Sequence, residues 1–119
     1  MSTILVVDDE STIRDLAQMI LEDAGYRVVL AQNGKEALQK IQAEAPDLVL
    51  LDMVMPEMSG LEVCKRLKSD PKTKLIPVVM FTVLGRDTDV EKAKQGGCDS
   101  YFVKPFTPSY LVAEVKRHL

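Results

Sequence analysis

Short runs of apolar, often β-branched residues alternate with amphipathic segments along the whole 119-residue chain. Five runs have the length of strands, and their nearly continuous apolar character is typical of a parallel sheet covered on both faces. These runs are ILVVD (4–8), YRVVLA (26–31), DLVLLD (47–52), IPVVMF (76–81) and SYFVK (100–104). The alternation therefore predicts a β/α protein in which helical crossovers join parallel strands.

The segments between these runs repeat apolar residues at helical spacing. They predict helices over about 11–24, 34–44, 59–69, 87–96 and 108–118. Three helix starts have a capping residue three positions before a glutamate, the spacing of a capping box; these residues are Asn33, Ser59 and Thr88. Five such units predict an open, doubly wound five-stranded sheet with helices on both faces, because a barrel needs a longer chain.

Composition narrows the class of protein. A content of 46% hydrophobic and 28% charged residues is ordinary for a globular chain, and the length predicts one domain over residues 1–119. The net charge of −3 argues against direct binding of nucleic acid through its phosphates. Cys64 and Cys98 form no CxxC pair and predict thiols in a reducing compartment. Without a signal peptide or a run of roughly 18 apolar residues, we expect a cytoplasmic protein that contacts no membrane.

Charged and hydroxyl side chains gather at the ends of the predicted strands, where open α/β sheets bind ligands. They are Asp8, Asp9, Asp52, Thr82 and Lys104. If the strand order reverses between the first and third strands, the three aspartates converge on one cleft. Two carboxylates about 4 Å apart repel by roughly 4 kcal/mol at an effective dielectric near 20, so three together favour a divalent cation. An all-oxygen ligand set with room for water is typical of Mg²⁺.

Asp52 follows the most apolar run of the chain, and a carboxylate beside a metal ion and an ammonium group can attack phosphorus to give an aspartyl phosphate. Lys104 would then neutralise the transferred phosphoryl group, and the Thr82 hydroxyl would donate to one of its oxygens. Each residue alone has an ordinary structural interpretation, as a helix cap, a strand residue or a solvated lysine. Their coincidence at the ends of four strands favours a site that accepts a phosphoryl group.

Four motifs occur in a fixed order: VVDDE (6–10), LLDMVMPEMSG (50–60), FT (81–82) and VKPF (103–106). With them the chain resembles, over its whole length, the receiver domain of two-component response regulators, and is similar to the single-domain chemotaxis type. The resemblance implies a flavodoxin-like fold with strand order 2-1-3-4-5. It also implies a phosphorylation-dependent signalling switch and not an enzyme.

The resemblance assigns roles at the phosphorylation site. It implies that Asp52 accepts the phosphoryl group from a histidine kinase or a histidine phosphotransfer protein. It implies that Asp8, Asp9, Asp52 and the backbone carbonyl of Val54 bind Mg²⁺, the expected cofactor. It also implies a cis peptide bond between Lys104 and Pro105, which an X-Pro bond allows at a cost of only about 0.5–1 kcal/mol.

The resemblance also implies a switch remote from the aspartates. Thr82 would move toward the phosphoryl group and Tyr101 would turn inward. These movements would remodel the face formed by the predicted helix 87–96, the strand 100–104 and the helix 108–118. That face would control a downstream protein or an output domain. We expect a monomer, or a weak dimer that depends on phosphorylation.

One departure from the family concerns the residues after Thr82. The family commonly has Ala, Ser or Gly next, whereas this chain has Val83 followed by Leu84. With Val54 they would form an apolar flank that cannot orient a hydrolytic water. Because side-chain assistance to such a step is typically worth about 10²–10⁴ in rate, its absence predicts a long-lived aspartyl phosphate.

Three alternative functions use related features. A haloacid-dehalogenase-like, Mg²⁺-dependent phosphatase needs a second acid two residues after the nucleophile, where this chain has Val54. A receiver-like interaction module that is never phosphorylated usually lacks an acid, the lysine or the hydroxyl, and none is missing here. A flavin-binding protein needs a phosphate loop after the first strand, and the acids of DDESTIR would repel the phosphate.

Overall fold

A computed structural model describes residues 1–82, 91 and 94–119. The strands are β1 (Thr3–Val7), β2 (Arg27–Ala31), β3 (Leu48–Asp52), β4 (Val78–Thr82) and β5 (Ser100–Val103). Within the described residues they form one parallel sheet in the order β2-β1-β3-β4-β5. The doubly wound fold and the strand order are therefore confirmed, and the order reverses between β1 and β3.

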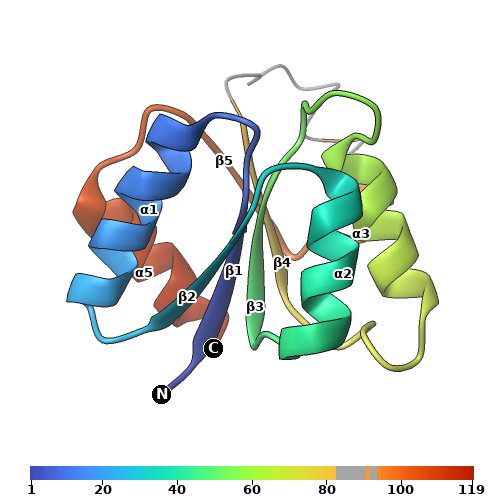
Figure 1. Cartoon of the computed structure of the whole chain (residues 1–119), viewed down its shortest axis with the longest axis horizontal. Helices are drawn as coiled ribbons and strands as arrows, with labels where there is room; N and C mark the ends of the chain where they lie inside the picture. The colour runs from blue at the N-terminus through green and yellow to red at the C-terminus, as the bar shows by residue number, and fades with distance from the viewer. Residues whose placement is uncertain (83–90, 92–93) are drawn as a thin grey trace.

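The helices are α1 (Ser11–Asp23), α2 (Gly34–Glu44), α3 (Gly60–Ser69) and α5 (Pro108–Arg117). Figure 1 shows α1 and α5 on one face of the sheet and α2 and α3 on the other. The predicted helix over 87–96, with its capping residue Thr88, lies mostly outside the described residues; Glu91, Lys94 and Gln95 are helical. Of the helices in the described part of the chain, none has both the length and the apolar character needed to cross a bilayer.

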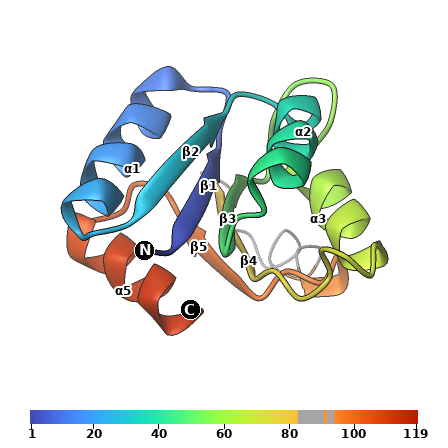
Figure 2. The same cartoon turned by 60° about the horizontal axis from the view of Figure 1, so that its bottom comes forward.

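Figure 2 shows the sheet between its two layers of helices. One hydrophobic core packs on each face of the sheet. Successive strand residues point to opposite faces, so Val6 and Leu50 pack toward α1 and α5 while Leu5 and Leu51 pack toward α2 and α3. Every residue of β1 and β3 is buried. A one-residue slip of either strand would exchange its two sets of core contacts, so packing fixes the register and with it the strand ends.

The predicted helix caps at Asn33 and Ser59 are confirmed. The Asn33 side chain accepts a hydrogen bond from the Glu36 backbone N–H at 2.8 Å, and the Ser59 hydroxyl accepts one from the Glu62 N–H at 3.3 Å. Both bonds satisfy N–H groups that the first helical turn leaves unpaired. The cap at Ser59 starts α3 directly after the loop that follows β3, so it helps to hold that loop.

The Cys64 thiol is part of the core and not a reactive group. Cys64 lies on α3 and is fully buried, and burial raises the pKa of its thiol to about 11. Cys98 is half-buried, and neither cysteine forms a disulfide. The prediction that Cys64 and Cys98 are thiols is therefore confirmed.

Candidate functional site

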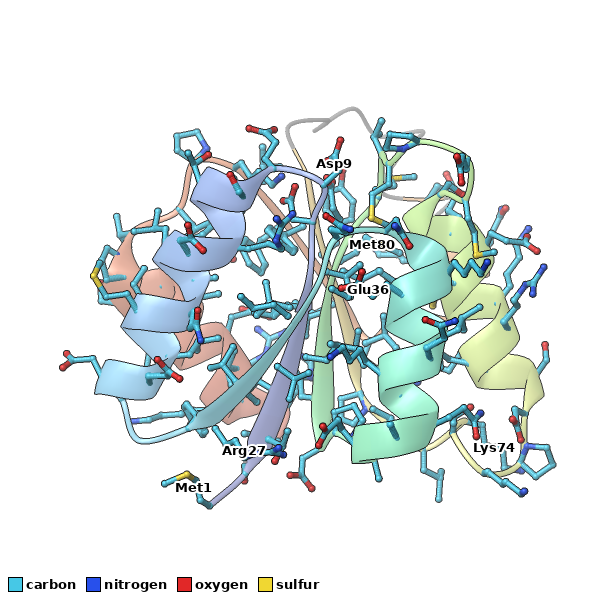
Figure 3. The ribbon with its side chains drawn as sticks, viewed as in Figure 1. Met1, Asp9, Arg27, Glu36, Lys74 and Met80 are labelled. Atoms are coloured by element: carbon cyan, nitrogen blue, oxygen red, sulfur yellow. The ribbon has the colours of Figure 1, made fainter. Side chains whose placement is uncertain are left out.

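The three predicted aspartates meet at the carboxyl ends of β1 and β3. Val7 pairs with Leu51 in the parallel ladder, so the chain leaves the two strands at nearly the same level. Carboxylate oxygens of Asp8, Asp9 and Asp52 all lie within 4.8 Å of one another. Asp8 and Asp52 are buried, whereas Asp9 is exposed and lies beyond the end of the sheet, as labelled in Figure 3. The cluster thus has two fixed, buried acids and one acid open to solvent.

Lys104 reaches the same cluster from the end of β5. Its Nζ lies 2.5 Å from Asp8 Oδ2 and 3.5 Å from Asp52 Oδ2. The Lys104 side chain is only 7% exposed, and its ammonium lies 4.9 Å from the centre of the Phe81 ring. This close cation partly neutralises two carboxylates that would otherwise repel each other. Lys104 is therefore placed where it can also neutralise a group attached to Asp52.

Backbone contacts fix the orientation of the two buried acids. Asp8 Oδ1 accepts a hydrogen bond from the Glu10 N–H at 2.9 Å, and Asp52 Oδ1 accepts one from the Val54 N–H at 3.3 Å. The Arg14 guanidinium donates to the Asp8 backbone carbonyl over 2.7 Å. Sequence reasoning missed Arg14, although its position in the first turn of α1, shortly after the acids, is a signal that could have identified it.

The loop after β3 depends on a close backbone approach at Gly60. A Cβ atom added to Gly60 would lie 2.1 Å from the Asp52 carbonyl oxygen, a distance that no side chain can adopt. Gly60 N–H also donates to the Met53 carbonyl at 3.0 Å. Glu57, in the same loop, has a φ of 67°, in the left-handed region. The loop that carries Val54 is therefore held tightly against the end of the strand that carries Asp52.

Burial makes Asp52 a carboxylate that titrates near neutral pH. Its pKa is raised from the usual 3.8 to about 6, first by desolvation and then by the negative charge of Asp8. The Lys104 ammonium and the Val54 N–H act in the opposite direction. Asp52 is ionised above this value and can then act as a nucleophile. Its ionised form is costly to keep buried without a further cation.

This pKa predicts how the stability of the metal-free protein depends on pH. The folded pKa lies above the unfolded value, so the folded state holds more protons between about pH 4 and pH 6, and stability falls as pH rises through that window. Asp52→Asn removes the buried charge. At pH 7.5 in EDTA it is expected to raise the free energy of unfolding by about 1–3 kcal/mol, and at pH 4 to leave it nearly unchanged.

Urea denaturation at the two pH values measures this difference. Asp15→Asn is the matched control, because Asp15 is exposed on α1 and has no side-chain partner among the described residues. Its free energy of unfolding is expected to equal that of the parent at both pH values. If Asp52→Asn raised the free energy of unfolding equally at pH 4 and pH 7.5, the buried charge would not be the cause of the gain.

The remaining predicted site residues lie on β4, β5 and the loops around them. Thr82 ends β4 and pairs with Val103 of β5, but its side chain is outside the described part of the structure. Tyr101 is half-buried on β5 and packs against the core that α2 and α3 cover. The Lys104–Pro105 peptide bond is cis.

The apolar flank proposed for the site is described only in part. Val54 is 52% exposed. Val83 and Leu84 lie outside the described residues. The long lifetime of an aspartyl phosphate that was inferred from these three residues therefore stays a prediction.

Comparison with known proteins identifies the family to which this chain belongs. The model of the response regulator receiver domain matches residues 4–116, and this chain belongs to that family. Receiver domains are signalling switches of two-component systems and not enzymes in the usual sense, and they bind Mg²⁺ at an acidic pocket. They interact with histidine kinases or phosphotransfer proteins and with downstream partners.

Individual relatives differ in how much of their length this chain covers. It is 43% identical over 114 residues to the phosphate regulon transcriptional regulatory protein PhoB of Pseudomonas aeruginosa, covering 96% of this chain and 50% of PhoB. It is 36% identical to the polar-differentiation response regulator DivK of Brucella anthropi, covering 98% of this chain and 95% of DivK. The chain thus spans about half the length of PhoB-type relatives and nearly all of DivK.

A similar structure has been solved for a chemotaxis protein. CheY4 of Vibrio cholerae superposes with a TM-score of 0.95 at 35% sequence identity, and the match covers 100% of this chain and 99% of CheY4. The predicted resemblance to single-domain chemotaxis receivers is therefore confirmed for the fold.

Proposed function

We propose that residues 1–119 act as one receiver domain in which Asp52 accepts a phosphoryl group from a histidine kinase or a histidine phosphotransfer protein. The observation that carries the proposal is the cluster of Asp8, Asp9 and Asp52 with Lys104 placed between its two buried acids. In the transfer, an Asp52 carboxylate oxygen bonds to phosphorus as the bond from phosphorus to the donor histidine nitrogen breaks. The electron pair of that broken bond stays on the imidazole.

The oxygen donors of the cluster fit Mg²⁺, a hard cation that prefers carboxylates, carbonyls and water. Asp8, Asp9, Asp52 and the backbone carbonyl of Val54 would hold it. When bound, Mg²⁺ would offset the negative charge of the phosphoryl group and of the carboxylates around it. The Lys104 ammonium, 2.5 Å from Asp8 and 3.5 Å from Asp52, has three N–H donors and could also contact a phosphoryl oxygen on Asp52. We propose that Lys104 turns one of its N–H groups toward the phosphoryl group in this step.

The conformational change of the switch would be transmitted through β5 and α5. Lys104 directly follows β5, the strand that contains Tyr101, so a shift of Lys104 toward the phosphoryl group acts directly on β5. The Thr82 hydroxyl would bind a second phosphoryl oxygen, and Tyr101 would turn inward. The face formed by residues 87–96, β5 and α5 would then bind a downstream protein or an output domain. We propose a cytoplasmic protein that is a monomer, or a weak dimer that depends on phosphorylation.

Nuclear magnetic resonance with Mg²⁺ and beryllofluoride, a mimic of the phosphoryl group, tests this function. Mg²⁺ alone is expected to shift resonances around Asp9, and beryllofluoride to extend the shifts to Tyr101 only when Mg²⁺ is present. Asp9→Asn is expected to weaken Mg²⁺ binding at least about tenfold, since losing even an outer-shell partner of a metal typically costs 10–100-fold.

The matched control is Asp15→Asn, which removes an exposed acid of α1 and should bind Mg²⁺ as the parent does. Beryllofluoride shifts that appear without Mg²⁺, or that are unchanged in Asp52→Asn, would contradict the proposed site. Unchanged Mg²⁺ binding in Asp9→Asn would remove Asp9 from the ligands and leave the role of Asp52 to be judged separately.

A further inference from the structure

The peptide group between Asp8 and Asp9 joins two of the three acids of the candidate site. Just before it, the Asp8 N–H donates to the Ala31 carbonyl of β2 at 3.2 Å, so the main chain is still bound to the sheet there. Beyond that bond the chain leaves the sheet, and Asp9 lies on the turn before α1 (Figure 3). Neither the N–H nor the side chain of Asp9 makes a hydrogen bond within the described residues. The direction of the Asp9 side chain therefore depends on how this peptide group is held.

The Arg14 side chain holds this peptide group by its carbonyl oxygen. The guanidinium donates to the Asp8 backbone carbonyl at 2.7 Å, and it forms no ion pair with an acid in the part of the chain that the structure describes. The base of the Arg14 side chain is fixed, because α1 packs on the sheet through the buried residues Ala17, Ile20 and Leu21. Arg14 thus links a rigid helix to the peptide group that precedes Asp9.

The start of α1 gives this turn little other support. Glu10 occupies the N-cap position, but its side chain accepts no hydrogen bond from the first turn, unlike the cap residues of α2 and α3. The Glu10 N–H donates to Asp8 Oδ1 at 2.9 Å, and the Arg14 N–H donates to the Glu10 carbonyl at 3.2 Å. Both bonds involve the backbone of Glu10, which follows Asp9. Among the described residues, only the Arg14 guanidinium makes a hydrogen bond to the peptide group between Asp8 and Asp9.

We propose that Arg14 is a positioning residue of the metal site, which holds the Asp8–Asp9 peptide group so that the Asp9 carboxylate converges with those of Asp8 and Asp52. The inference rests on the proposed function, because it assumes that these carboxylates bind Mg²⁺. In this role Arg14 contacts neither the ion nor the phosphoryl group. Its positive charge alone would act in the opposite direction, since a cation near the cluster repels Mg²⁺. The sign of the change in Mg²⁺ affinity when Arg14 is removed therefore separates positioning from charge.

Calorimetric titration of the full chain with Mg²⁺ compares the parent with Arg14→Met, which keeps the apolar stem of the side chain and removes its donors. The variant is expected to bind Mg²⁺ about tenfold more weakly, a loss typical of removing an outer partner of a metal site. Arg14→Lys keeps a charged donor, and its affinity should lie between the two. Arg66→Met, on α3, is the control for net charge, and its affinity should be no weaker than that of the parent. Circular dichroism verifies that each variant is folded.

A double-mutant cycle with Asp9→Asn shows whether Arg14 acts through Asp9. Once Asp9 no longer binds the ion, adding Arg14→Met should weaken Mg²⁺ binding by less than about twofold, which is within the error of simple additivity. Nuclear magnetic resonance without Mg²⁺ gives a second readout. The carbonyl carbon resonance of Asp8 should shift in Arg14→Met, because its hydrogen bond is lost, and should stay unchanged in Arg66→Met.

Mg²⁺ binding by Arg14→Met as tight as that of the parent, or tighter, would overturn the proposal. So would an equal loss from Arg14→Met in the parent and in Asp9→Asn, because Arg14 would then act independently of Asp9. Both results leave the proposed function intact when the parent itself binds Mg²⁺ and Asp52 is phosphorylated. A parent that binds no Mg²⁺ would overturn the proposed function and this inference together.

Discussion

Lys104→Met is expected to lower the free energy of unfolding of the metal-free protein by about 3 kcal/mol at pH 7.5. Breaking a buried ion pair by removing one partner typically costs about 3–5 kcal/mol, because the other charge stays buried without compensation. The Lys104 ammonium contacts Asp8, which is fully buried, and also approaches Asp52. We expect the lower end of the range, since Asp52 has a pKa of about 6 and can take up a proton. Met keeps most of the apolar stem that packs against Phe81.

Urea denaturation in EDTA and again in Mg²⁺ gives the measurement. Mg²⁺ should restore part of the lost free energy of unfolding, because it binds the folded state and replaces the missing positive charge. Lys65→Met is the matched control, since Lys65 is an exposed lysine of α3 without a side-chain partner in the described residues. A loss in Lys104→Met no larger than that of the control would show that the ammonium does not neutralise the cluster.

Gly60→Ala is expected to destabilise the fold by about 3 kcal/mol and to weaken Mg²⁺ binding. The new Cβ would lie 2.1 Å from the Asp52 carbonyl oxygen, and a backbone atom inside the sheet cannot move away as a side chain can. Overpacking a tight site costs about 1–3 kcal/mol, and sometimes more. The loop from Met53 to Ser59 must shift instead, and this would displace the Val54 carbonyl that we propose as a Mg²⁺ ligand.

Gly25→Ala is the matched control for this change. A Cβ at Gly25 would meet no atom within 4 Å, but the φ of 98° is costly for an alanine, so the variant loses about 1–2 kcal/mol without a clash. Thermal unfolding and Mg²⁺ titration of both variants are compared with the parent. We expect Gly25→Ala to lower stability and to leave Mg²⁺ binding unchanged. Equal effects of the two substitutions on Mg²⁺ binding would mean that the approach of Gly60 to Asp52 does not position the metal ligands.

Much of the fold follows from local patterns that the sequence shows directly. The five apolar runs each became a strand, and four of the five helical segments lie within a residue or two of their predicted bounds. Burial of β1 and β3 on both faces explains why their residues are apolar without alternation. The strand order could not be obtained this way, because apolar runs do not specify their neighbours. It came from the resemblance to receiver domains.

The candidate site was predictable where it depends on strand ends and not where it depends on loop geometry. The convergence of Asp8, Asp9 and Asp52 follows from the reversal of strand order between β1 and β3. The close approach of Gly60 to the Asp52 carbonyl does not, because a glycine after a serine cap looks like an ordinary helix start. Likewise, α2 ends at Ala45 in the left-handed region, with a φ of 44° and no glycine to indicate it.

The contacts of Lys104 are a further feature that the sequence predicted only in part. Its type and place at the end of a strand predicted a counter-charge for Asp52. The structure shows that its closer contact is with Asp8, at 2.5 Å, and that its contact with Asp52 is at 3.5 Å. Both acids have their other carboxylate oxygen held by a backbone N–H, that of Glu10 for Asp8 and that of Val54 for Asp52. Such a distinction depends on side-chain positions that no sequence pattern encodes.

Mass spectrometry of the protein after incubation with Mg²⁺ and acetyl phosphate tests the central claim most directly. The account predicts one phosphoryl group per chain, located on Asp52, and none when Mg²⁺ is removed or in Asp52→Asn. Asp15→Asn should be phosphorylated as the parent is. Phosphate on a different residue of the parent, or retained in Asp52→Asn, would contradict the assignment of Asp52 as the phosphoryl acceptor.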